Sequence, residues 1–193
     1  MSILCSLIGR GPLLIACAEA LKQRGFGIRG VISSCEQTTA WCQRHGVPQI
    51  RAEDDHLAFL SQQPFDYLFS IVNHAITAEE VLALPRSAAI NFHDSPLPDY
   101  AGFNAVAWAI LDGRAQHGIT WHRMTQAVDQ GEILVSEAVA INDDDTAFTL
   151  STRCGEAALR GFQKLLDKLQ AGDLSGTVAG EQAAWLRVDR ASA

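Results

Sequence analysis

The 193-residue sequence lacks the features that mark several large classes of protein. It has no run of Lys or Arg and its formal net charge is −7, which argues against nucleic acid as a partner, because nucleic-acid binding relies on clustered positive charge. No apolar segment approaches the length of a membrane span, and residues 1–8 lack the basic region and long apolar core of a signal peptide. We therefore expect neither a nucleic-acid partner nor a membrane partner.

Paired cysteines are absent as well. The five cysteines are odd in number and show neither a C-x-x-C pair nor the spacing of metal ligands. His117 and His122 have no third ligand at a suitable spacing, so we expect them to have structural or pocket-wall roles and expect no metal. The unpaired cysteines favour a reducing, cytoplasmic location.

The composition is that of an ordinary globular domain. Hydrophobic residues make up 48% of the chain and charged residues 19%, and a chain of this length can bury a sizeable core without disulfides. We expect one domain over residues 1–175. Residues 176–193 are expected to form a tail, rich in Gly, Ser and Ala, with Trp185 as its one aromatic anchor.

Apolar, extended segments alternate with helical patterns along most of the chain. This alternation predicts an α/β fold: a Rossmann-like, doubly wound, mostly parallel sheet flanked by helices. The expected strands are residues 2–8, 27–33, 47–50, 65–72, 88–93, 119–124 and 133–141, and the expected helices are residues 13–24, 38–44, 54–62, 77–84, 105–111 and 146–170. Thr77 with Glu80 is expected to cap one helix and Asp144 the last one, whose buried face is expected to include Phe148.

Asn91, His93 and Asp129 are the residues that suggest chemistry. Asn91 and His93 fall at the carboxyl end of a predicted strand, where ligands bind in sheets of this kind, and Asp129 lies in the loop between the last two predicted strands. Taken singly, each residue has an ordinary structural explanation. Together, an amide, an imidazole and a carboxylate can stabilise an oxyanion, move a proton and fix a tautomer, as acyl transfer through a tetrahedral intermediate requires.

The joint pattern around these residues is specific. Asn-x-His-x-Ser-x-Leu-Pro-x-Tyr-x-Gly begins at Asn91, His-Gly-Ile-Thr-x-His-x-Met begins at His117, and Asp-x-Gly-x-Ile-Leu begins at Asp129. This block resembles the formyltransferase family that uses 10-formyltetrahydrofolate, which includes glycinamide ribonucleotide, methionyl-tRNA and nucleotide-sugar formyltransferases. The resemblance covers roughly residues 3–170 and implies the same Rossmann-like fold.

The resemblance implies that Asn91, His93 and Asp129 are the catalytic trio. When an acceptor amine attacks the formyl carbon, negative charge develops on the formyl oxygen, and the Asn91 amide and a protonated His93 are donors that could face it. Asp129 could favour the protonated form of His93, and could hold or relay the proton that leaves the amine. Which group takes that proton stays open at this point.

The resemblance also implies a folate pocket, in which backbone groups read the pteridine edge and apolar side chains pack against its ring. By position in the family, its lining is expected to be Ala75, Ile76, Thr77, Val81, Ser95, Leu97, Thr125, Gln126, Ala127 and Val128. Ile76 and Val81 could equally be ordinary core residues.

Two departures from the family pattern disfavour particular acceptor molecules. Gly9-Arg10-Gly11-Pro12 has too few glycines and hydroxyls for a phosphate cradle, which disfavours glycinamide ribonucleotide. The chain ends where methionyl-tRNA formyltransferases continue into a second domain, which disfavours tRNA. The segments 91–95, 100–105 and 117–122 are especially similar to the formylation domains of nonribosomal peptide synthetases.

The sequence therefore predicts formyl transfer from 10-formyltetrahydrofolate to an amine, carried as an aminoacyl group on a peptidyl carrier protein in nonribosomal peptide formylation. Asn73 and His74 are candidates for the acceptor side, although a loop turn explains them more simply. The alternatives are N-formylation of an amino sugar nucleotide or another small amine, hydrolysis of formyltetrahydrofolate, and a non-catalytic interaction module of a larger synthetase.

Overall fold

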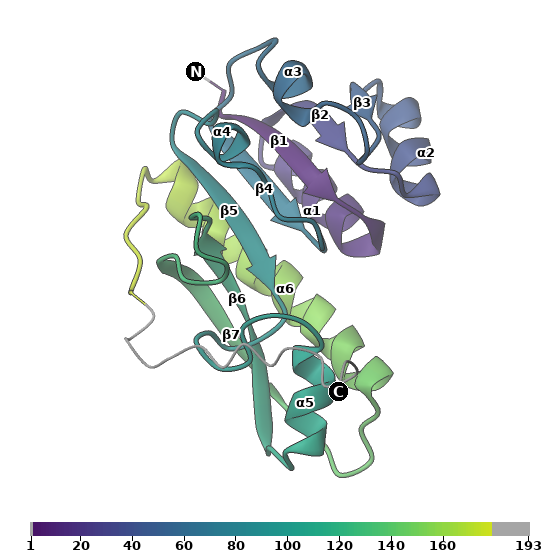
Figure 1. The fold of residues 1–193 in the computed structure, drawn as a ribbon, viewed down its shortest axis with the longest axis vertical. Helices are drawn as coiled ribbons and strands as arrows, with labels where there is room; N and C mark the ends of the chain where they lie inside the picture. The colour runs from purple at the N-terminus through teal and green to yellow at the C-terminus, as the bar shows by residue number, and fades with distance from the viewer. Residues whose placement is uncertain (1, 179–193) are drawn as a thin grey trace. The chain divides into compact units, whose positions relative to one another are not determined.

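The computed structural model describes residues 2–178, so Trp185 and residues 179–193 of the expected tail lie outside the described residues. The chain divides into two compact units, one ending at Asn91 and the other beginning at Phe92. Its strands follow the order β3-β2-β1-β4-β5-β6-β7 in a seven-stranded sheet (Figure 1). This mostly parallel sheet, accompanied by helices, confirms the predicted fold class.

Parallel strands form the sheet of the first unit. β1 (Leu4–Gly9) pairs with β2 (Gly27–Ile32) on one side and with β4 (Tyr67–Ile71) on the other, while β3 (Gln49–Ile50) pairs with β2 and β5 (Ala88–His93) pairs with β4. β4 is buried along its whole length, as expected for a strand covered on both faces. The connecting helices are α1 (Gly11–Gln23), α2 (Glu36–His45), α3 (His56–Leu60) and α4 (Glu79–Leu82).

A close backbone approach defines the end of β1. The Arg10 N–H donates to the Ile71 carbonyl at 3.1 Å, and a Cβ on residue 9 would lie 1.8 Å from that carbonyl oxygen. Gly9 also has φ +136°, a conformation that other residues rarely adopt. Glycine is therefore required where β1 passes into α1.

The second unit is a β-hairpin covered by a long helix. β6 (Gln116–Arg123) and β7 (Ile133–Ala140) pair in antiparallel fashion, and α6 (Ala147–Gln170) packs along both strands (Figure 1). α5 (Ala105–Leu111) packs against α6. The Trp121 ring lies 4.9 Å from Phe162 and 5.4 Å from Phe92 between centroids, and its indole N–H donates to the Ala158 carbonyl at 3.0 Å. This aromatic cluster anchors the helix to β6.

The start of α6 differs from the prediction. Its N-cap is Thr146 rather than Asp144, because the Thr146 hydroxyl accepts from the Thr149 N–H while the Thr149 hydroxyl bonds back to the Thr146 N–H. This reciprocal capping box satisfies two backbone donors with local groups. Phe148 is 80% exposed, so its expected place on the buried face was wrong. It stands in the first turn, before the buried face of the helix begins at Leu150.

The predicted helix over residues 77–84 is shorter than expected. α4 is a single turn that begins after Ala78, which makes no side-chain cap, so the proposed capping role of Thr77 was wrong. The Thr77 hydroxyl is buried instead and has no hydrogen-bond partner among the described residues.

Within residues 2–178, no helix combines the length and apolar character needed to cross a membrane.

Replacing Phe162 by Ala is expected to lower the free energy of unfolding by about 3–5 kcal/mol, because the change leaves a cavity beside Trp121 in the core of the second unit. Phe148→Ala on the same helix is the matched control and should change stability by no more than about 0.5 kcal/mol, since that ring is exposed. Urea unfolding followed by circular dichroism measures both variants. Equal losses would contradict this account of the core.

Candidate functional site

A buried carboxylate lies between two buried histidines in the second unit. His93 Nδ1 is 3.6 Å from Asp129 Oδ2, and His122 Nε2 is 3.5 Å from Asp129 Oδ1. Each of the three side chains is less than a tenth exposed. The structure thus brings His93 and Asp129 together, as the sequence predicts, and adds His122 to the cluster.

Asn91 precedes this cluster in the same strand as His93. The two residues are separated by one position in β5, so strand alternation directs their side chains to the same face of the strand. Asn91 pairs in parallel with Ser70 of β4, which fixes its place at the end of the first unit.

The backbone holds Asp129 in an unusual conformation. Asp129 has φ 56°, in the left-handed region, and its Oδ2 accepts a hydrogen bond from the Gly102 N–H at 3.0 Å. Two residues later, a Cβ at Gly131 would lie 1.9 Å from the Arg123 carbonyl oxygen. Only glycine allows this loop to close so tightly against the end of β6. The spacing Asp-x-Gly therefore has a direct steric cause.

Both ring nitrogens of His93 have partners. Nε2 lies 3.1 Å from the Tyr100 carbonyl oxygen, which can only accept, so Nε2 carries the hydrogen of that bond. Nδ1 faces the Asp129 carboxylate.

The electrostatic balance at Asp129 favours the ionised carboxylate. Burial acts most strongly and opposes ionisation, but the contact with His122, the charge of His93 and the Gly102 N–H together lower the pKa of Asp129 below its ordinary value. Asp129 is therefore an anion at neutral pH, although little solvent reaches it.

β6 supports the segment that follows His93. The Thr120 hydroxyl donates to the Ser95 carbonyl at 2.7 Å and accepts from the Leu97 N–H at 3.1 Å, while His117 Nε2 lies 2.7 Å from the Asp94 carbonyl oxygen. Burial is the main cause of the lowered pKa of His117, so this ring is neutral at pH 7 and serves as a support. The His117 and Thr120 side chains of the His-Gly-Ile-Thr motif therefore hold residues 94–97 in place.

Sequence reasoning missed the positioning roles of Thr120 and His122. A signal was present, because Ile119-Thr120-Trp121-His122 alternates apolar and polar residues in a strand that is buried throughout its centre. Ile119 and Trp121 face Gly161 of α6, while Thr120 and His122 occupy the alternate positions and contact the residue 95–97 segment and Asp129. Polar residues on one face of a fully buried strand indicate partners on that face.

The expected folate residues of the first unit lie in and after a turn. Ala75 and Ile76 are exposed, the latter to 84%, whereas Thr77 and Val81 are buried. The Asn73 side chain bonds both the N–H and the carbonyl of Ala75, so Asn73 is a turn former here. His74 Nδ1 lies 2.8 Å from an Arg10 guanidinium nitrogen.

The expected folate residues of the second unit fall in two segments. Ser95 and Leu97 are buried, and the Ser95 hydroxyl donates to the Asp99 carbonyl at 2.7 Å. The Thr125 hydroxyl donates to the Ala127 carbonyl at 2.9 Å, Gln126 is exposed, and Val128 is about half exposed. The hydroxyls of Ser95 and Thr125 therefore shape their own loops, and contact with folate stays a prediction for both segments.

The chain belongs to the formyl transferase family, which it matches over residues 48–166, more than half of its length. Among residues 2–178, no cluster of three or more His, Cys, Asp or Glu residues could hold a metal ion.

Solved structures of formyltransferases share this fold. The phosphoribosylglycinamide formyltransferase of Anaplasma phagocytophilum is 25% identical over 95% of this chain and 98% of its own, with a TM-score of 0.81. That of Brucella melitensis is 24% identical over 92% of this chain and 100% of its own, with a TM-score of 0.78. An N-formyltransferase of Helicobacter canadensis, in complex with folinic acid and dTDP-3-aminofucose, is 19% identical over 95% of this chain and 70% of its own, with a TM-score of 0.79.

The lowered pKa of Asp129 predicts a pH-dependent contribution to stability. Because its folded-state pKa lies below the unfolded value of about 3.9, the contribution is complete above that value and is lost as the pH falls through the folded-state pKa. The stability difference between the wild type and Asp129→Asn should therefore shrink below about pH 4. Urea unfolding at pH 5 and below, where unfolded histidines are already protonated, isolates this effect. Asp143→Asn, at an exposed carboxylate, is the control, and a difference that grows in acid would contradict the assignment.

Proposed function

We propose that the chain transfers a formyl group from 10-formyltetrahydrofolate to the amine of an acceptor, with Asn91, His93 and Asp129 as its catalytic residues. The observation that carries the proposal is the buried contact between His93 and an ionised Asp129, in a chain of the formyl transferase family. A buried carboxylate of this kind places charge where a reaction needs it, because the surrounding protein screens that charge less than water does.

In the proposed reaction, the neutral amine attacks the formyl carbon and a new C–N bond forms. The formyl oxygen becomes an oxyanion, which the His93 Nε2–H and the Asn91 amide stabilise. The bond from carbon to N10 of the folate then breaks, and the proton lost by the amine ends on N10. The Asp129 carboxylate holds or relays this proton, directly or through water, and stabilises the positive charge on His93 meanwhile.

His93 must exchange one partner in this mechanism. Its Nε2–H bonds the Tyr100 carbonyl at 3.1 Å, so the formyl oxygen has to take the place of that carbonyl. Catalytic hydrogen bonds often form only in the complex with substrate, and an oxyanion is a stronger acceptor than a neutral carbonyl. His122 stays on the other side of Asp129 and holds the carboxylate in place.

Ile76 and Val128 are proposed as apolar contacts of the folate, because both are exposed apolar side chains, as expected of residues that pack on a pteridine ring. The other contacts are proposed at Ala75, Thr77, Val81, Ser95, Leu97, Thr125, Gln126 and Ala127. The complex of the Helicobacter canadensis N-formyltransferase with folinic acid supports a reduced folate as the donor.

The acceptor is proposed to be an aminoacyl group on a peptidyl carrier protein, on the basis of the segments around Asn91, Tyr100 and His117. An amino sugar nucleotide is the second candidate, because the Helicobacter canadensis enzyme was solved with dTDP-3-aminofucose. Free thiols at all five cysteines are consistent with a reducing, cytoplasmic location for either reaction.

Replacing His93 by Ala is expected to lower the rate of formyl transfer by about 10²–10⁴-fold, because the change removes a donor to the oxyanion together with the group paired with Asp129. The release of tetrahydrofolate, followed by absorbance, measures the rate. His56→Ala, at a histidine on α3 in the other unit, is the control and should keep the wild-type rate. Near-normal turnover by the His93 variant would refute the role given to this residue.

The acceptor is identified by comparing turnover with different amines. The wild type is expected to release tetrahydrofolate fastest with an aminoacyl carrier protein, more slowly with dTDP-3-aminofucose or glycinamide ribonucleotide, and slowest without an acceptor. Faster release with dTDP-3-aminofucose would assign the second candidate. Formate release at the full rate without an amine would instead identify a hydrolase, and failure of calorimetry to detect a reduced folate would favour a non-catalytic module.

A further inference from the structure

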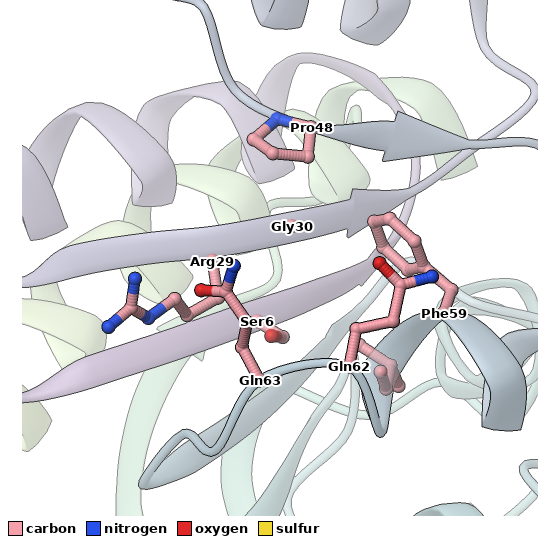
Figure 2. A pocket seen from close by; sticks show the side chains of 8 residues that line it. Ser6, Arg29, Gly30, Pro48, Phe59, Gln62 and Gln63 are labelled. Carbon is pink, nitrogen blue, oxygen red and sulfur yellow. The ribbon is translucent and has the colours of Figure 1, made fainter.

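Polar side chains outside the proposed catalytic cluster converge on Tyr100 rather than on a cavity. The small cavity between β1, β2 and α3 has a volume of about 60 Å³ and is lined by none of the proposed catalytic residues. The Arg29 guanidinium extends away from it, and the Ser6 hydroxyl has almost no exposed surface (Figure 2). Tyr100, in contrast, is hydrogen-bonded through its side chain to the turn after α5, while its carbonyl accepts from His93.

The turn that follows α5 is fixed by its own backbone. The N–H groups of residues 112, 113 and 114 all donate to carbonyls at the end of α5, at 2.8, 3.0 and 3.1 Å. Gly113, at φ 63°, ends the helix in the left-handed conformation that is common after a helix C-terminus. The side chains of Asp112 and Arg114 therefore project from a fixed piece of backbone.

Both of these charged side chains hold the phenol of Tyr100. The Tyr100 hydroxyl donates to Asp112 Oδ2 at 2.8 Å and accepts from the Arg114 Nε–H at 3.0 Å. The Arg114 guanidinium also lies over the Tyr100 ring, 5.7 Å from its centroid. His117 meets the same ring edge-on, at 6.1 Å between centroids. We refer to Asp112 and Arg114 together as the phenol clamp.

Tyr100 needs such support because its backbone is strained. Its φ is 56°, a left-handed conformation that costs free energy for a bulky residue and persists only where the surrounding contacts enforce it. The carbonyl of the same residue accepts from His93 Nε2 at 3.1 Å. The contacts of the phenol are therefore transmitted through a single residue to the imidazole ring.

We propose that Asp112 and Arg114 are positioning residues for formyl transfer, which act through Tyr100 to hold the carbonyl that orients His93. This inference rests on the proposed function, in which the formyl oxygen takes the place of that carbonyl. The phenol clamp thus sets both the orientation of the imidazole before the reaction and the position from which the carbonyl has to move. Small displacements of a reacting group lower a rate strongly, so this hold affects turnover.

Tyr100→Phe tests the phenol clamp, because the change removes both hydrogen bonds and keeps the ring. With the acceptor that the wild type uses fastest, we expect kcat to fall about tenfold and the KM for 10-formyltetrahydrofolate to change less than about twofold, since the clamp acts on His93 and not on binding. The release of tetrahydrofolate measures both. Tyr67→Phe removes the hydroxyl of the other tyrosine, on β4, and should keep the wild-type kcat.

A double-mutant comparison shows whether Asp112 acts through the phenol. Asp112→Ala should lower kcat in the wild type and have no further effect in Tyr100→Phe, because the bond it removes is already missing there. Asp112→Asn keeps an oxygen that can accept from the phenol and should restore most of the rate. Equal effects of Asp112→Ala in both backgrounds would overturn the proposal. Arg114→Ala should also lower kcat, and an unchanged rate would remove Arg114 from the clamp.

NMR of the His93 ring nitrogens gives a readout that does not depend on activity. In the ¹⁵N-labelled chain, their signals, assigned with the His93→Ala variant, should shift in Tyr100→Phe and Asp112→Ala and stay in place in Tyr67→Phe. Unshifted signals in the first two variants would show that the clamp does not position the ring. If the wild type transfers no formyl group, the proposed function fails, whereas shifted signals still support the hold on His93. Circular dichroism confirms the folding of each variant.

Discussion

Burying the Asp129 carboxylate costs free energy that its neighbours must offset, and much of the second unit is arranged around that requirement. An unpaired charge in such a place would become neutral or destabilise the fold. His93, His122 and the Gly102 N–H surround the carboxylate and lower the pKa of Asp129 despite burial. These partners come from β5, the end of β6 and the loop before α5, so three distant segments must fold together before the carboxylate is stable.

The supports of this cluster are largely backbone groups. A carbonyl at Tyr100 orients His93, an N–H at Gly102 holds Asp129, and the close approach of residue 131 to the Arg123 carbonyl closes the loop. Groups on the backbone are positioned by the fold itself and lose no side-chain entropy when they bind. The presence of glycine at positions 102 and 131 is therefore explained by backbone contacts, just as the polar side chains are explained by their hydrogen bonds.

The parts of the structure that depend on local periodicity were predictable. Buried parallel strands and the long helix α6 follow from continuous or helical apolar patterns, and Asn91 and His93 lie at the end of β5 as their spacing predicts. Capping was not predictable in detail, because Asp144 and Thr146 are both good N-cap residues and the choice depends on Thr149. The alternation of apolar and polar residues in β6 indicates a polar partner for His122, but it neither identifies Asp129 as that partner nor reveals the register shift between Trp121 and His122.

In the proposed reaction, the formyl oxygen replaces the Tyr100 carbonyl as the hydrogen-bond partner of His93, and this exchange favours the transition state over the bound substrate. While the formyl group is neutral, its oxygen competes with the Tyr100 carbonyl for the same Nε2–H, so substrate binding gains little from that donor. As the oxyanion forms, the new hydrogen bond becomes charge-assisted and exceeds the one it replaces. The donor thus contributes most where charge is greatest, which raises turnover rather than ground-state affinity. Positive φ angles at Tyr100 and Asn104 show that this segment is held in a strained conformation, and a strained segment can release its carbonyl at lower cost than a relaxed one.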